Sequence, residues 1–351
     1  MSKIEKLLDK TRRKGDTKKW KMYVFAVVGI LIIVGGFFGT MALLNPIIDE
    51  YIISSKDIVS LYKFYDTHQK QTDTEIFFLG DSCIGNAIFP EEINDILNKS
   101  GHSNVTVYNL EISSDTPLQR ALSIPEIINL KPSCVVYGVT YRSITSIQYA
   151  GDTVWNSDNA GLIGNRVTLT PNLKSLLSDE EIEDLQEGNN PMFKKRFLSS
   201  AVSNKLNNKN TGYRDYEIDP YRGKDARINM DPGSLEAIIK DVNNPKHNFR
   251  PVITNESTRH KDALLYNVRE LENAGIHVVL INMPLHPLCS EKITDESRKN
   301  FFDLLNQTEA NWYDYEYALD GEYFRDTHHM SYYGAHLFAP LMADLIIQEL
   351  T

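Results

Sequence analysis

The chain has 351 residues, of which 42% are hydrophobic and 24% are charged, and its formal net charge is −10. This length and composition allow one large domain or two modest ones, and they exclude a chain that is disordered throughout. Residues 1–21 hold nine Lys and Arg against three acidic residues, a local charge of +6, so the remainder carries −16 and does not suit nucleic acid as a partner.

The basic segment leads into residues 22–44, an apolar run whose only ionisable side chain is Tyr23. About 20 apolar residues span a bilayer, whereas a cleaved signal peptide has a shorter apolar region and a small-residue cleavage site. We therefore predict an uncleaved transmembrane helix at 22–44. Because Lys and Arg stay in the cytoplasm, residues 1–21 form a cytoplasmic tail and residues 45–351 lie outside, in a single-pass protein of the cell membrane.

Helical spacing of apolar residues then predicts a stalk helix within 45–74, lying against the domain or the membrane surface. From residue 75 onward, short apolar runs rich in β-branched residues alternate with helical segments. The strands are predicted at 75–80, 104–110, 133–139, 276–283 and 311–316. The helices are predicted at 90–100, 116–130 (interrupted near Pro125), 256–275, 295–307 and 331–350.

This alternation predicts an α/β fold in which helices cover both faces of a parallel sheet. The polar stretch at about 146–250 breaks the pattern, and we predict that it is a helical insertion or cap over one end of the sheet. Residues 75–351 are thus expected to be one extracytoplasmic domain carrying this insertion.

Two polar motifs lie where a parallel sheet places its ligands, beyond the carboxyl ends of the strands. The first strand ends in Gly80-Asp81-Ser82, where a tight turn would expose the serine hydroxyl near free backbone N–H groups. The ordinary alternative is a polar turn after a strand. The adjacent Cys83 is a competing nucleophile, but a thiolate would need an electropositive site.

The second motif, Asp326-x-x-His329, precedes the last predicted helix. Such a loop can place an imidazole over a serine while the carboxylate fixes its tautomer. His328 competes for the role of base, and the three-residue spacing favours His329. A capping loop is the structural alternative, since Ser331 is suited to cap the helix that follows.

Together the two motifs resemble those of the SGNH (GDSL-like) hydrolase family. The resemblance covers roughly residues 75–145 and 256–350 and implies a flavodoxin-like three-layer α/β/α sandwich. It also implies a catalytic triad of Ser82 as nucleophile, His329 as base and Asp326 as the residue that orients it. The resemblance implies no cofactor and no metal. Asp326, His328 and His329, with Asp81, are an alternative candidate metal site by residue type.

The family's other two motifs differ in this chain. Where a glycine supplies an oxyanion N–H, the chain has Ser113 or Ser114, and where the family has an oxyanion asparagine, it has Thr140. Tyr141 or Arg142 are alternative donors to the oxyanion. Arg142 is also a candidate to bind a phosphate or carboxylate, and His286, in a loop after a core strand, is a candidate substrate contact.

These departures, with the anchor, are similar to the membrane-anchored cell-envelope branch of the superfamily, which includes DltD-like and AlgX/AlgJ-like proteins. That likeness implies acyl transfer through Ser82 onto or from a cell-envelope polysaccharide or polymer, alongside a membrane-bound O-acyltransferase. The competing hypothesis is a catalytically silent protein of this fold that binds the polymer or scaffolds the acyltransferase. The intact triad favours the first, and Thr140 favours the second.

Overall fold

The protein is represented by a computed structural model. The structure describes residues 20, 22–41, 43, 56–145, 163, 164, 166–187, 203, 231–243 and 252–350. The chain divides into two compact units, and the larger one contains residues 54–189 and 212–351.

The smaller unit contains a helix that is long and apolar enough to cross a membrane. It runs over Met22–Met41, with a mean hydropathy of 2.4, and only 6% of its most apolar window is buried. Side chains such as Phe25, Ile32 and Ile33 are at least 69% exposed. The predicted apolar helix is therefore present, although its predicted end at residue 44 lies outside the described residues.

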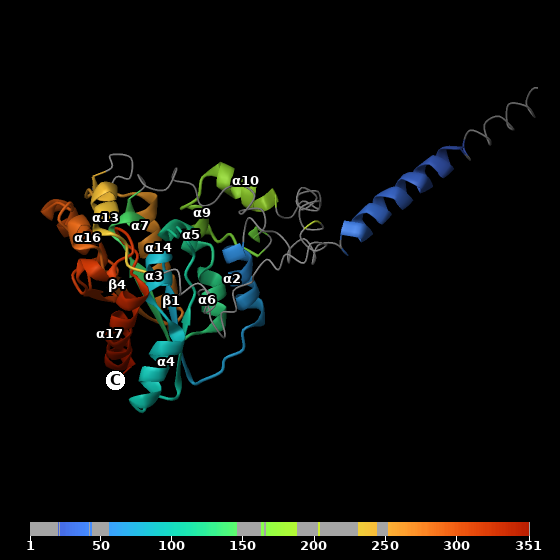
Figure 1. The fold of residues 1–351 in the computed structure, drawn as a ribbon. Coiled ribbons are helices and arrows are strands. Elements are labelled where there is room, and N and C mark those ends of the chain that lie inside the picture. Colours follow the sequence, from blue (N-terminus) through green and yellow to red (C-terminus); the bar gives the residue numbers. More distant parts are fainter. Residues whose placement is uncertain are drawn as a thin grey trace, which may run out of the picture. The chain divides into compact units, whose positions relative to one another are not determined.

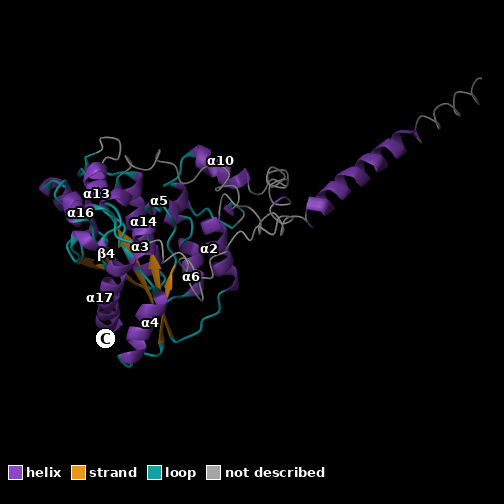
Figure 2. Ribbon diagram, in the orientation of Figure 1, coloured by secondary structure: helices purple, strands orange, loops and turns teal. Residues whose placement is uncertain are grey.

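The larger unit is built on a five-stranded sheet in the order β2-β1-β3-β4-β5. All four pairings are parallel. The strands are β1 (Thr74–Leu79), β2 (Val105–Asn109), β3 (Cys134–Val139), β4 (His277–Asn282) and β5 (Asn311–Asp314), drawn in orange in Figure 2. This is the flavodoxin-like order, in which the chain reverses its direction across the sheet between β1 and β3, and ligands bind at that reversal.

Helices cover both faces of the sheet. Figure 1 shows α4 and α17, which share one face, beside the strands. One face packs on α3 (Ser82–Ala87), α4 (Pro90–Lys99) and α17 (Tyr332–Leu350). The other packs on α2 (Lys56–Thr67), α5 (Pro117–Ala121), α6 (Ile124–Leu130), α7 (Tyr141–Ile144), α14 (Arg259–Asn273) and α16 (Asp295–Asn306). The remaining described elements are α9 (Pro171–Lys174), α10 (Asp179–Glu187), α13 (Leu235–Val242), α15 (Pro287–Ser290) and the 3-10 helix η3 (Gly321–Tyr323).

Strand alternation explains the two cores. Phe77 and Leu79 of β1 point into one hydrophobic cluster, and Ile76 and Phe78 point into the other, because successive side chains of a strand lie on opposite faces. All four side chains are at most 1% exposed. The predicted three-layer α/β fold with a parallel sheet is therefore confirmed.

Most predicted elements have their observed counterparts within one to three residues. The helix predicted at 116–130 is two helices, α5 and α6, which separate just before Pro125. The stalk helix corresponds to α2, and its Leu61, 0% exposed, belongs to the domain's own core. Much of the predicted insertion at 146–250 lies outside the described residues; its described parts hold α9, α10 and α13 and no strand.

Candidate active site

The turn after β1 requires a glycine. Gly80 has φ +143, and a Cβ there would lie 2.8 Å from the carbonyl oxygen of Gly138 on β3. Asp81 then caps α3, accepting a hydrogen bond from the Cys83 N–H at 2.8 Å. Ser82 is consequently the first helical residue, and its N–H is among those that a helix leaves without an intrahelical acceptor.

A buried amide at the end of β2 holds this short helix in place. Asn109, 0% exposed, donates from Nδ2 to the carbonyl oxygens of Ile88 at 2.9 Å and Ile84 at 3.3 Å. Asn86 donates from Nδ2 to the Ser82 carbonyl at 2.6 Å. Sequence reasoning missed Asn109, although a polar residue at the carboxyl end of a core strand was a usable signal.

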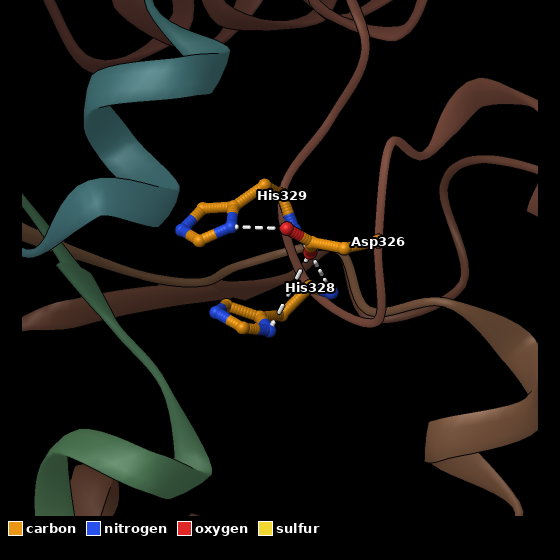
Figure 3. Close-up of side chains that lie close together, drawn as sticks. All are labelled: Asp326, His328 and His329. Atoms are coloured by element: carbon orange, nitrogen blue, oxygen red, sulfur yellow. Dashed lines mark hydrogen bonds and ion pairs between the residues drawn. The ribbon is translucent and has the colours of Figure 1, made fainter. Parts of the chain in front are cut away.

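The structure brings the three predicted triad residues together across 247 positions of sequence. His329 Nε2 lies 2.7 Å from Ser82 Oγ, and His329 Nδ1 lies 2.7 Å from Asp326 Oδ2. Figure 3 shows the second of these contacts. A carboxylate can only accept, so Nδ1 carries the hydrogen and Nε2 accepts from the Ser82 hydroxyl.

The Asp326 carboxylate also organises its own loop. Its Oδ1 accepts from the backbone N–H groups of His328 at 3.0 Å and His329 at 2.8 Å. Burial acts to raise the pKa of Asp326, but the hydrogen bond from His329 and the electrostatic attraction of the two neighbouring imidazole rings outweigh it and hold that pKa below its usual range. The carboxylate is therefore ionised and in position to orient the imidazole.

The His328 ring has its Nδ1 3.6 Å from Oδ1 of Asp326 and has further partners on its other sides. Nη1 of Arg142 lies 2.9 Å from its Nδ1 and 2.5 Å from its Nε2, and Thr327 Oγ1 lies 2.8 Å from its Nδ1. Because a guanidinium can only donate, one nitrogen of the ring accepts from Arg142 and the ring is neutral. Burial, followed by the electrostatic influence of the His329 ring and of the Arg142 guanidinium, holds the pKa of His328 well below its ordinary value. The contact of Arg142 with His328 is a second feature that the sequence did not predict.

Asp326, His328 and His329 have donor atoms that all lie within 4.8 Å of one another (Figure 3). Both carboxylate oxygens already accept hydrogen bonds. The guanidinium of Arg142 against His328 also adds positive charge where a cation would have to bind. We assign no metal to this group.

Ser114, one of the two candidates for the missing glycine, has the backbone conformation that glycine favours. Its φ is 63, and its side chain is exposed. The same loop is tied to the nucleophile turn, because the Ile112 N–H donates to the Gly80 carbonyl at 3.1 Å. A buried ion pair follows in the same segment, in which Nε of Arg120 donates to Oδ2 of Asp115 at 2.7 Å. Ser114 thus lies in a loop joined directly to the turn that carries Ser82.

Thr140 lies at the carboxyl end of β3 and acts as the N-cap of α7. Its Oγ1 accepts from the Ser143 N–H at 3.1 Å, and the Ser143 hydroxyl accepts from the Thr140 N–H at 3.1 Å. This reciprocal arrangement is a capping box. The side chain at the position of the family's oxyanion asparagine therefore has a structural task of its own.

Two other candidates have side chains engaged elsewhere. The Tyr141 hydroxyl donates to Oε2 of buried Glu316 at 2.7 Å, and Arg298 donates to the same carboxylate. His286, 3% exposed, caps α15 by accepting from the Leu288 N–H at 3.2 Å. We correct both expectations: the Tyr141 hydroxyl is committed to Glu316 rather than to an oxyanion, and the His286 imidazole is enclosed rather than presented to substrate.

Cys83 is not a competing nucleophile in this geometry. Its side chain is 3% exposed. Burial, aided by the charge of Asp81, raises the pKa of its thiol well above the usual value. The thiolate that nucleophilic attack requires is thus disfavoured.

Comparisons with known proteins give weak likenesses. A protein-family model matches residues 212–351, which is less than half of the chain. No curated protein sequence matches. Among solved structures, one described as a GDSL-like lipase from Bacteroides thetaiotaomicron is 12% identical with a TM-score of 0.37, over 82% of this chain and 97% of that one. Another, described as an acylhydrolase from Bacteroides fragilis, is 12% identical with a TM-score of 0.34, over 82% and 95%. At these scores the geometry of Ser82, His329 and Asp326 has to carry the functional conclusion.

Proposed function

We propose that the chain is a serine esterase or O-acyltransferase in which Ser82 carries the acyl group. The observation that carries the proposal is the continuous pair of 2.7 Å contacts from Ser82 Oγ through the His329 ring to the Asp326 carboxylate. Nucleophile, base and orienting group within hydrogen-bond reach are the arrangement that activates a serine for acyl transfer.

The chemistry follows from the proton positions. His329 Nε2 takes the proton from Ser82 as Oγ bonds to the ester carbonyl carbon, and the negative charge develops on the carbonyl oxygen. The bond to the leaving alcohol then breaks, and the imidazolium returns its proton to that alcohol. An acceptor hydroxyl or water next loses its proton to His329 and attacks the acyl-enzyme. Ser82 is regenerated, and the product is an ester or a carboxylic acid.

The negative charge that develops on the carbonyl oxygen must be stabilised by hydrogen-bond donors. The Ser82 N–H at the start of α3 and the Ser114 N–H in the adjoining loop are our first candidates, because both belong to the turns that meet at Gly80. Thr140 and Arg142 are the side-chain candidates, since both follow β3 at the same sheet edge. Removal of one such donor from an enzyme can lower the rate about 10²–10³-fold.

We further propose a setting at the cell envelope. The candidate spanning helix at Met22–Met41, preceded by a basic segment, supports a single-pass anchor with its N-terminus in the cytoplasm. The larger unit would then act outside, on O-acyl groups of an envelope polysaccharide or polymer, alongside a membrane-bound O-acyltransferase. The competing function is a non-catalytic binding or scaffolding protein, and the capping task of Thr140 is the observation that favours it.

Active-site labelling distinguishes the catalytic function from the non-catalytic one. The full-length protein, held in lipid nanodiscs, is incubated with a fluorophosphonate probe as wild type, Ser82→Ala and His329→Ala. We expect labelling of wild type only, with the modified residue identified as Ser82 by peptide mass. Ser100→Ala, a change at an exposed serine at the end of α4, is the matched control and should label like wild type. Wild type that takes up no probe would favour the non-catalytic function.

A further inference from the structure

A pocket lies beside the nucleophile at the carboxyl ends of β3 and β4. Two of its lining residues adjoin the triad in sequence: Cys83 follows Ser82, and His328 precedes His329. Its walls come from the start of α3, the turn into α7, the segment after β4, and α15 with the turn that follows it. Whatever group it holds therefore sits next to an ester that reacts with Ser82.

Much of the pocket lining is apolar. These walls consist of side chains that carry only carbon or sulfur beyond the backbone, namely Cys83, Met283, Pro284, Leu285, Cys289 and Ile293. Burial raises the pKa of the Cys289 thiol to about 12, and that of Cys83 is also raised, so both sulfurs stay protonated and uncharged. These walls suit an uncharged aliphatic group and disfavour an ionised one.

The remaining lining residues carry polar groups. Thr140, Tyr141 and Arg142 follow β3, Asn282 ends β4, and His328 belongs to the loop that carries the base. An acyl group likewise combines a polar carbonyl with an apolar chain. The enclosed space is small and admits little more than one or two water-sized groups.

We propose that this pocket receives the chain of a short, uncharged acyl group, of about two or three carbons, whose carbonyl is attacked by Ser82. The inference rests on the proposed acyl transfer and names its substrate class. A long fatty acyl chain would not fit, so the enzyme acts on small O-acyl substituents rather than on lipid esters.

The experiment measures kcat/KM of the full-length protein in nanodiscs with p-nitrophenyl acetate, propionate and hexanoate. Ile293→Phe fills the pocket and should lower the propionate-to-acetate ratio of kcat/KM at least tenfold, because a fitted pocket that excludes one methylene discriminates by about 10–200-fold. Cys289→Ala enlarges the pocket and should raise the ratio by about three- to fourfold, because it gains only the free energy of burying about one more methylene. Cys134→Ala is the matched control, because Cys134 is a buried thiol of β3 that does not line the pocket, and it should leave the ratio unchanged.

A second ester series identifies the end of the substrate that the pocket holds. With acetate fixed and the alcohol lengthened from methyl to butyl, the pocket variants should leave the preference unchanged. If they change this series and not the acyl series, the pocket binds the alcohol and the inference is wrong. The inference is also wrong if the fluorophosphonate probe labels Ser82 normally and the pocket variants change the preference in neither series. Wild type in which Ser82 does not react overturns the proposed function itself, which is a separate outcome.

Discussion

The two sides of the Ser82 turn are built differently. On one side, Ser82, His329 and Asp326 meet through side-chain contacts of 2.7 Å, and each of these side chains is placed by backbone hydrogen bonds of its own loop or helix. On the other side, Thr140 caps α7, the Tyr141 hydroxyl binds Glu316, and Ser114 contributes a backbone in a left-handed conformation. The comparison teaches that, in the proposed mechanism, proton transfer would have dedicated side chains, whereas stabilisation of an oxyanion would depend on backbone groups and on residues with other structural tasks.

The largest effect is expected on the first side. Asp326→Asn should lower kcat by about 10⁴-fold, because an amide can donate to Nδ1 and stabilise the wrong tautomer of His329. Hydrolysis of p-nitrophenyl acetate measures this, and urea unfolding checks that the variant is folded. Asp320→Asn, in the loop before η3, is the matched control and should retain the wild-type rate. A loss below tenfold for Asp326→Asn would mean that the carboxylate is not the orienting group.

Thr140→Asn tests the second side. Asparagine caps helices as well as threonine does and also offers an N–H donor, so the free energy of unfolding should change little while kcat rises about 10- to 100-fold. Thr140→Ala serves as the comparison and should cost about 1 kcal/mol of unfolding free energy through loss of the cap. An Asn variant no faster than wild type would show that residue 140 does not reach the oxyanion, and the two sides would then be less closely linked than we propose.

Tyr141→Phe should separate structure from chemistry next to Thr140. Loss of the hydrogen bond to buried Glu316 is expected to cost about 1–2 kcal/mol in unfolding free energy, because Arg298 still satisfies part of the carboxylate. The value of kcat should stay within about twofold of wild type, since a hydroxyl committed to Glu316 contributes nothing to the oxyanion. Tyr333→Phe, at an exposed position of α17, is the control for stability. A large fall in kcat without loss of stability would return Tyr141 to the active site.

The smallest effect concerns pH. The pKa of His328 is lowered in the folded state, so its contribution to stability is complete above the ordinary histidine pKa of about 6.5 and is lost as pH falls below it. The lowered pKa of Asp326 keeps the contribution of that carboxylate down to about pH 4. As pH is lowered from 6.5 to 4, the midpoint temperature of thermal unfolding should therefore fall less steeply for His328→Gln than for wild type. His102→Gln, outside the site, is the control and should show the same pH dependence as wild type. Identical pH dependence of wild type and His328→Gln would contradict the neutral state of His328.

The strands and long helices were predictable because each carries a local pattern. Residues 76–79 form an uninterrupted apolar run, as expected of a strand buried on both faces, and the helix predicted at 295–307 has apolar residues on one face and acids in its first turn. The short helices α3, α7 and α15 were missed, because four to six residues are too few to show a helical period. Their caps, Asp81, Thr140 and His286, instead appeared as candidate site residues.

Residue types and spacing alone indicated an apolar anchor, a parallel sheet and a pair of motifs whose chemistry suits a serine nucleophile. Only the tertiary structure decided which way each side chain turns. It brought His329 to Ser82, put His328 against Arg142, and committed Tyr141 and His286 to internal hydrogen bonds. The reason is physical: a strand end fixes where a residue lies, but the direction of its side chain depends on burial and on partners that are distant in the chain. The pocket beside Cys83 has the same origin, since its walls come from segments that the sequence separates by more than 200 residues.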